Sequence, residues 1–156
     1  MSVIGRMIGG ILRPILERQA RGRSLETFAS SLERSGEEIT ERLQRAPDTP
    51  HNREVANHIA GLERWGQRRL RVTLGEPFVP DSYRGYRLPE GTDIKALRLA
   101  FADTRRGTVE LARELSFTDP MTQTKVHHND LGELSVGGWL SYLEGHAKRE
   151  SSRIKV

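Results

Sequence analysis

The stretch DIKALRLAFADTRRGTVELAREL, residues 93–115, has the most regular apolar repeat in this sequence. Its apolar and threonine side chains recur at alternating spacings of three and four residues, which place them on one face of an α-helix. A stripe this narrow is typical of the seam between the helices of a bundle. We therefore predict a helix over residues 93–115 within an all-α fold. The stripe consists of Ile94, Leu97, Phe101, Thr104, Thr108, Leu111 and Leu115.

Three further segments have a helical period. We predict helices over residues 25–43 and 53–74, which end at RAPDTP and at GEP, respectively. The last helix begins after Ser135, a suitable N-cap, and continues to the C-terminus. The segment FVPDSYRGYRLPEGT, residues 78–92, has no helical period and suits a long crossover. Together these segments predict an up-down-down-up four-helix bundle with a crossover between its second and third helices.

Composition excludes several classes of site. The chain has 156 residues and no cysteine, so disulfides, thiolate metal sites and a thiol nucleophile are excluded. The net charge is +4, but residues 1–23 alone hold five arginines and one glutamate. The rest of the chain is neutral by count, so it has no basic excess for general nucleic-acid binding.

Residues 1–22 form a separate amphipathic arm in this interpretation, and residues 23–156 form the bundle. Apolar pairs recur in the arm every four residues, at Val3/Ile4, Met7/Ile8, Ile11/Leu12 and Ile15/Leu16. We expect this stripe to pack on the bundle or on a second copy, which would make a homodimer. Peripheral binding to an anionic membrane is the alternative. No run of apolar residues is long enough for a membrane span, and we expect a cytoplasmic protein.

Three polar side chains interrupt the apolar faces of the second and fourth helices. His58 lies between Val55 and Leu62 on the core-facing side, and His146 and Glu150 lie one turn apart. A buried carboxylate is costly unless it is paired or bound to a cation. If the two helices are antiparallel, the three side chains meet and could hold a metal ion. Otherwise the histidines are ordinary core residues and Glu150 reaches water or an arginine.

Other polar residues are weaker candidates. Thr104 and Thr108 could line a cavity, although threonines commonly bond back to their own helix. We expect Arg105 to be a solvated surface residue rather than a substrate anchor. The pair His127 and His128 precedes the last helix, about 16 Å from the level of its metal-ligand candidates, and we do not expect it to join them. His51 we expect to cap a helix or face water.

Two motifs carry a resemblance to a known family. They are NREVANHIAGLERW, residues 52–65, and HHNDLGELSVGGWLSYLEGHAKRESSRI, residues 127–154. They resemble the His-hydrophobic-Ala-x-x-Glu segment and the final His-x-x-x-His segment of the DinB/YfiT-like four-helix-bundle metalloenzymes. With the helix lengths and the crossover, the resemblance covers about residues 25–156.

The resemblance implies a divalent-metal site with one ligand from the second helix and two from the last. The matching positions are His58, His146 and Glu150, where Glu150 replaces the family's usual histidine. Glutamate is still a competent ligand, since two histidines and one carboxylate occur at catalytic zinc and non-haem iron centres. Zinc or nickel is the expected ion, with iron or manganese as alternatives.

The family also implies two reaction classes for a small-molecule substrate. One is hydrolysis by a metal-activated water, and the other is transfer of a low-molecular-weight thiol through a metal-activated thiolate. The alternative is a metal-free bundle that binds a small molecule or a protein in a stress response. The sequence identifies neither the substrate nor a catalytic residue beyond the metal ligands.

Overall fold

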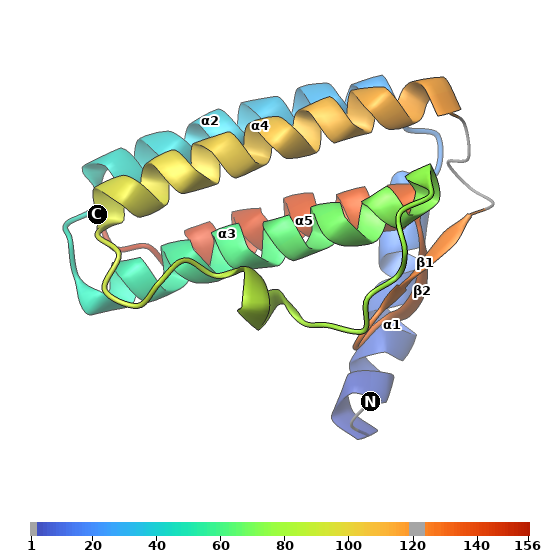
Figure 1. Ribbon diagram of the computed structural model, residues 1–156, viewed down its shortest axis with the longest axis horizontal. Helices are drawn as coiled ribbons and strands as arrows, with labels where there is room; N and C mark the ends of the chain where they lie inside the picture. Colours follow the sequence, from blue (N-terminus) through green and yellow to red (C-terminus); the bar gives the residue numbers. More distant parts are fainter. Residues whose placement is uncertain (1–2, 119–123) are drawn as a thin grey trace.

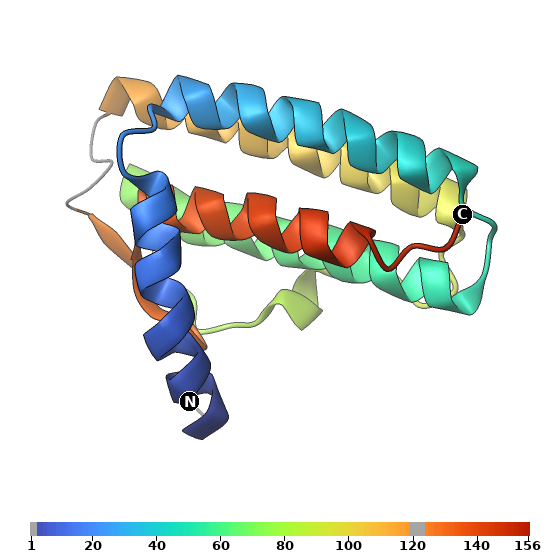
Figure 2. The same ribbon diagram turned by 180° about the vertical axis from the view of Figure 1, so that it is seen from behind.

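The computed structural model describes the backbone of residues 3–118 and 124–156 and the side chains of residues 7–116 and 124–156. Four long helices lie side by side in two pairs, α2 with α4 and α3 with α5 (Figure 1). Helices α3 and α4 run in one direction and α2 and α5 in the other, as the reverse view shows (Figure 2). The described chain is mostly helical, as predicted. The helices are α2 (Leu25–Arg45), α3 (Pro50–Arg71), α4 (Ile94–Thr118) and α5 (Val136–Ser151).

The predicted apolar faces form the core between these helices. All seven residues of the stripe of α4 are buried, including Thr104 and Thr108. Thr104 donates a hydrogen bond to the carbonyl of Ala100, as is common for threonines within helices. The repeat in residues 93–115 therefore identified the buried face of α4 correctly.

The ends of the helices follow their capping residues. Ser135 caps α5 by accepting a hydrogen bond from the backbone N–H of Gly138, as predicted. Helix α3 begins at Pro50, three residues earlier than predicted, because Thr49 caps it and proline suits the first turn. Helix α5 ends at Ser151 rather than at the C-terminus. The buried side chain of Asn52 bonds the backbone N–H and carbonyl of Lys155, and these bonds hold the tail in a non-helical path.

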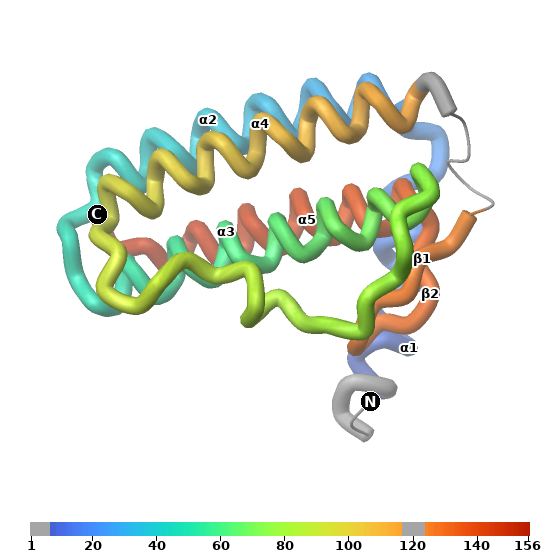
Figure 3. The backbone as a smooth tube through the Cα atoms, in the orientation of Figure 1, coloured from blue at the N-terminus to red at the C-terminus, as the bar shows by residue number. Residues whose placement is uncertain are grey.

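The segment between α3 and α4 crosses the length of the molecule, as predicted (Figure 3). It contains two short 3-10 helices, Val72–Leu74 and Tyr83–Tyr86. Tyr83–Tyr86, labelled η2 below, packs on α3.

A β-hairpin precedes α5, and the sequence analysis did not predict it. Strand β1 (Lys125–His128) pairs antiparallel with β2 (Gly132–Ser135). The turn places Gly132 at φ 77°, a left-handed conformation that favours glycine. Each strand has four residues, which is too short for a clear alternation of apolar and polar side chains.

The N-terminal arm forms a helix, α1 (Val3–Ala20), that contacts α5 and β2. Leu16 on its inner face is buried. Gly9 allows α1 to lie close to the backbone of the turn between β1 and β2, since a β-carbon there would lie 2.7 Å from the carbonyl oxygen of Asp130. Packing of this face on the rest of the molecule was expected, whereas the opposite face is exposed. The exposed residues are Met7, Ile8, Ile11 and Ile15, and the side chains of Val3 and Ile4 lie outside the described ones.

No helix within residues 3–118 and 124–156 combines the length and the hydropathy that crossing a bilayer requires.

Candidate metal centre

His58, His146 and Glu150 come together between α3 and α5. His58 lies early in α3 and His146 near the end of α5, and these helices are antiparallel neighbours (Figure 1). The Nε2 atoms of the two histidines are 3.1 Å apart. One ligand atom from each of the three side chains lies within 4.8 Å of the others. The fold thus assembles the three residues that the sequence analysis selected as candidate ligands.

A divalent ion fits the two histidines by distance and by donor chemistry. Two nitrogens each about 2.1 Å from one ion lie about 3.0 Å apart at a right angle and about 3.4 Å apart at the tetrahedral angle. The 3.1 Å between the Nε2 atoms falls between these values. Two imidazoles and one carboxylate suit several divalent metals. The cluster could therefore hold an ion, whereas the donor set does not select one metal.

Both imidazoles are held in the neutral form that metal binding requires. Burial, with a smaller contribution from the charge of His58, lowers the pKa of His146 to about 3. Burial also lowers the pKa of His58. At neutral pH each ring therefore has one nitrogen that bears a lone pair and can serve as a metal ligand.

Arginines orient the third side chain, Glu150. Arg153 Nη1 donates to Glu150 Oε2 at 2.5 Å, and Arg149 Nε lies 3.7 Å from Oε1. Burial raises the pKa of Glu150, but the Arg153 hydrogen bond and the electrostatic interaction with His146 outweigh it, so that this pKa is lowered. His51 bonds the backbone carbonyl of Arg153 and thereby holds that residue in place. Glu150 reaches an arginine, as one alternative predicted, and also lies beside the two histidines.

Two tyrosines border the cluster, and the sequence analysis missed both. The Tyr83 ring meets the His58 ring edge-on, with centroids 5.0 Å apart. The Tyr142 ring lies 5.7 Å from that of His146. Tyr142 could have been found from its position one helical turn before His146. The sequence had no comparable signal for Tyr83, which lies in the crossover.

Asp81 fixes the crossover that carries Tyr83. Its carboxylate accepts hydrogen bonds from Trp65 Nε1 at 3.0 Å and from the hydroxyl of Tyr86. Its backbone carbonyl accepts from Arg69 Nη2 and from Asn129 Nδ2. One residue therefore links the crossover to α3 and to the hairpin, close to the candidate centre.

The other histidines lie outside the three-residue cluster. His127 is on β1 and pairs with Glu133. His128 is buried and meets Tyr142 edge-on with ring centroids 4.6 Å apart. Burial, with a smaller effect of Arg69, lowers the pKa of His128 to about 3. The ring nitrogen Nδ1 of His128 accepts backbone N–H groups of the hairpin turn, so this residue supports the turn.

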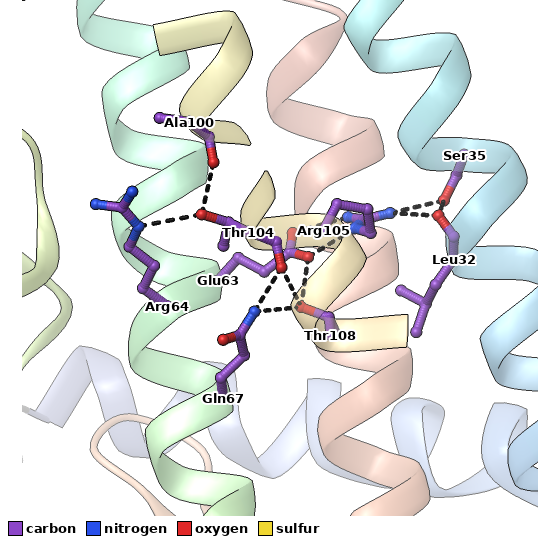
Figure 4. A network of polar contacts seen from close by, with 9 residues as sticks. All are labelled: Leu32, Ser35, Glu63, Arg64, Gln67, Ala100, Thr104, Arg105 and Thr108. Carbon is purple, nitrogen blue, oxygen red and sulfur yellow. Dashed lines mark hydrogen bonds and ion pairs between the residues drawn. The ribbon is translucent and has the colours of Figure 1, made fainter. Parts of the chain in front are cut away.

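Arg105 is not a solvated surface residue, and that expectation was wrong. Its side chain is only 3% exposed and forms a forked pair with Glu63, at 2.6 Å from Nε and 2.8 Å from Nη2 (Figure 4). Its Nη1 donates to the hydroxyl of Ser35 and to the carbonyl of Leu32 on α2. Gly36 leaves room for this side chain, since a β-carbon there would lie 2.5 Å from Arg105 Cγ. Arg105 therefore joins three helices instead of facing solvent.

Comparisons with protein-family models, curated proteins and solved structures found no match for this chain. The resemblance to the DinB/YfiT-like family therefore stays a prediction from the two sequence motifs.

Proposed function

We propose that this protein is a divalent-metal-dependent enzyme with a DinB-like, up-down-down-up four-helix bundle. The observation that carries the proposal is the convergence of His58, His146 and Glu150, whose ligand atoms lie within 4.8 Å of one another. The directions of α2 to α5 and the long crossover agree with such a bundle (Figure 1). The reaction would be hydrolysis or transfer of a low-molecular-weight thiol to or from a small molecule.

The chain's own residues prepare this centre. The two neutral imidazoles present nitrogen donors, and Arg153 holds the carboxylate of Glu150 in an ionised form. An ion held by three protein ligands would supply Lewis acidity, which lowers the pKa of a water or thiol in the open positions. Because the chain has no cysteine, a reacting thiol would come from a cosubstrate. Zinc or nickel is the expected ion, with iron or manganese as alternatives.

The test is elemental analysis of the purified, untagged protein after exposure to each metal and dialysis. We expect about one ion per chain in the native protein and loss of the ion in His146→Ala and in Glu150→Ala. His127→Ala is the matched control, because this partly exposed histidine pairs with Glu133 and lies outside the cluster. Absence of any ion from the native protein would overturn the enzyme proposal.

A groove supports the alternative, a metal-free bundle that binds a small molecule or a protein. It lies between α2 and α4, away from the histidines, and has a volume of about 560 Å³. Its apolar part includes Val109 and Ala102, and glutamates border it. Retention of the fold without metal, together with a ligand whose binding is lost in Ala102→Glu, would favour this function.

We also propose that the exposed face of α1 forms a homodimer contact. Met7 and Ile11 are 67% and 70% exposed, and Ile8 and Ile15 lie on the same face. Met7 and Ile15 lie four residues on either side of Ile11, so the stripe matches itself when two such helices pack antiparallel about a two-fold axis. In such a dimer, the exposed face of α1 in each copy would cover the same face of the other copy.

Light scattering coupled to size-exclusion chromatography tests this contact. We expect a dimer for the native chain and a monomer for Ile11→Glu. Ser30→Glu, which adds the same charge at an exposed position of α2, should remain dimeric. A native protein that is monomeric at all concentrations would overturn the dimer proposal.

A further inference from the structure

The three tyrosines of the chain differ in what their hydroxyl groups bind. The hydroxyl of Tyr86 donates to Asp81 and so takes part in fixing the crossover. The hydroxyls of Tyr83 and Tyr142 make no hydrogen bond to another residue in the part of the chain that the structure describes. Two of the three phenols are therefore available to a ligand.

These two phenols border the same small region. Tyr142 lies one helical turn before His146 on α5, whereas Tyr83 reaches His58 from η2. The Tyr142 phenol also interacts electrostatically with Tyr83 and with Glu150. The rings thus approach the candidate centre from two different elements, one beside each histidine.

Neighbouring side chains hold the Tyr142 ring in place. Trp139 meets it edge-on at 5.9 Å, and the buried imidazole of His128 does so at 4.6 Å. The crossover that carries Tyr83 is fixed through Asp81. Hydrogen-bond donors that are positioned before a ligand arrives bind it at a smaller entropic cost.

The charges around the centre indicate the kind of group that these donors would meet. Arg87 and Arg153 both act electrostatically on His58, and Arg149 acts on His146. Glu54 pairs with Arg87, and Glu150 pairs with Arg153. A bound divalent ion would leave this region with an excess of positive charge. A ligand with an oxyanion is complementary to it.

We propose that Tyr142 and Tyr83 are substrate-binding residues, whose hydroxyls donate hydrogen bonds to a carboxylate or similar oxyanion of a small molecule at the centre. The inference rests on the proposed metal-dependent function and adds the substrate class. It also assigns the two phenols separate positions, Tyr142 beside His146 and Tyr83 beside His58. The ligand is thereby held between α5 and the crossover.

The experiment uses the full chain loaded with cobalt(II), which takes the place of zinc and reports ligand binding through its visible spectrum. The probe is acetohydroxamate, a small oxyanion that also coordinates metals. Its affinity is measured for the native protein, for Tyr142→Phe and Tyr83→Phe, and for the control Ser116→Ala. Phenylalanine retains the ring and removes only the hydroxyl, so packing is conserved. Cobalt content is determined for every sample.

We expect the affinity for acetohydroxamate to fall at least tenfold in Tyr142→Phe and in Tyr83→Phe, because each variant loses a hydrogen bond to a charged group. Ser116→Ala removes an exposed hydroxyl that bonds the carbonyl of Arg113 on α4, so it should bind the probe like the native protein, and all variants should retain cobalt. Normal cobalt content with unchanged affinity in both Tyr142→Phe and Tyr83→Phe would overturn this inference alone. A native protein that takes up no cobalt would overturn the proposed function and the inference with it.

Discussion

Two polar clusters each include a residue of α3, Glu63 in one and His58 in the other, five residues apart. They differ in how completely their polar groups are hydrogen-bonded or ion-paired. Glu63 is enclosed, and its two oxygens accept hydrogen bonds from Arg105 and from Thr108 (Figure 4). At His58, the ring bonds His146, and the phenols beside the two histidines have no partner residue in the described chain. We name these the closed cluster, Glu63 with Arg105, and the open cluster, His58 with His146 and Glu150.

The difference separates a structural role from a binding role. In the closed cluster both charges are almost fully buried, and each is compensated by the other and by hydroxyl or carbonyl groups. Both charged groups are therefore used within the fold. The open cluster keeps neutral nitrogens and an oriented carboxylate next to partly exposed rings. Burial of polar groups alone therefore does not identify a site, whereas incomplete pairing does.

The largest expected effect comes from breaking the closed cluster. Arg105→Ala leaves the carboxylate of Glu63 buried without its cation, which should lower the free energy of unfolding by about 3–5 kcal/mol. Urea unfolding at neutral pH measures this loss. Arg106→Ala is the control, because its exposed ion pair with Asp103 should contribute less than about 1 kcal/mol.

A double variant identifies the cause of that loss. Glu63→Met with Arg105→Met removes both charges and keeps similar volume, so much of the stability should return. If the double variant were as unstable as Arg105→Ala, packing rather than an unpaired charge would explain the effect.

Metal addition should give the next largest effect and act only on the open cluster. A metal present at about 100 times its dissociation constant should raise the free energy of unfolding by about 2.7 kcal/mol. Calorimetry of the native protein and His146→Ala, with and without metal, measures the increment. Glu63→Gln should be less stable than the native protein yet show the same increment. Loss of the increment in Glu63→Gln would mean that the two clusters are coupled.

A smaller effect is expected on acidification of the metal-free protein. The pKa of His146 is about 3 in the folded chain and about 6.5 in an unfolded one, so the unfolded chain binds more protons between these values. His146 therefore makes its full contribution to the free energy of unfolding above pH 6.5. This contribution decreases by about 1.4 kcal/mol per pH unit as the pH falls toward 3. Urea unfolding at pH 7 and pH 5 should show a smaller decrease in His146→Gln. An identical decrease would argue against a buried neutral imidazole at this position.

The sequence predicted those features that depend on local periodicity. The spacing of three and four residues in α4 gave its buried face, and Ser135 marked the start of α5. His58 and His146 could be predicted to lie close together because one is early in its helix and the other late, which places both at the same height when the two helices are antiparallel. Glu150 followed from its spacing of four residues after His146. Each of these inferences uses residues within one helix or a simple relation between two.

Features that depend on packing between distant segments could not be predicted in this way. Arg105 is buried because Gly36, 69 residues earlier, leaves room for it and Glu63 supplies the countercharge. Tyr83 lies beside His58 because Asp81 binds Trp65 of α3. Helical periodicity indicates which face of a segment is buried, but it does not identify the side chain that lies opposite.

The contact between Glu17 and Ser135 also has a consequence for folding during synthesis. Glu17 accepts hydrogen bonds from the backbone N–H and the hydroxyl of Ser135, across a sequence separation of 118 residues. At about 5–20 residues per second, a ribosome needs roughly 6–24 s to make the intervening chain. During that interval α1 lacks its partner helix, and both of its apolar faces are open to chaperones or to a neighbouring nascent chain. Slow translation between these two residues would therefore lengthen the period in which aggregation competes with folding.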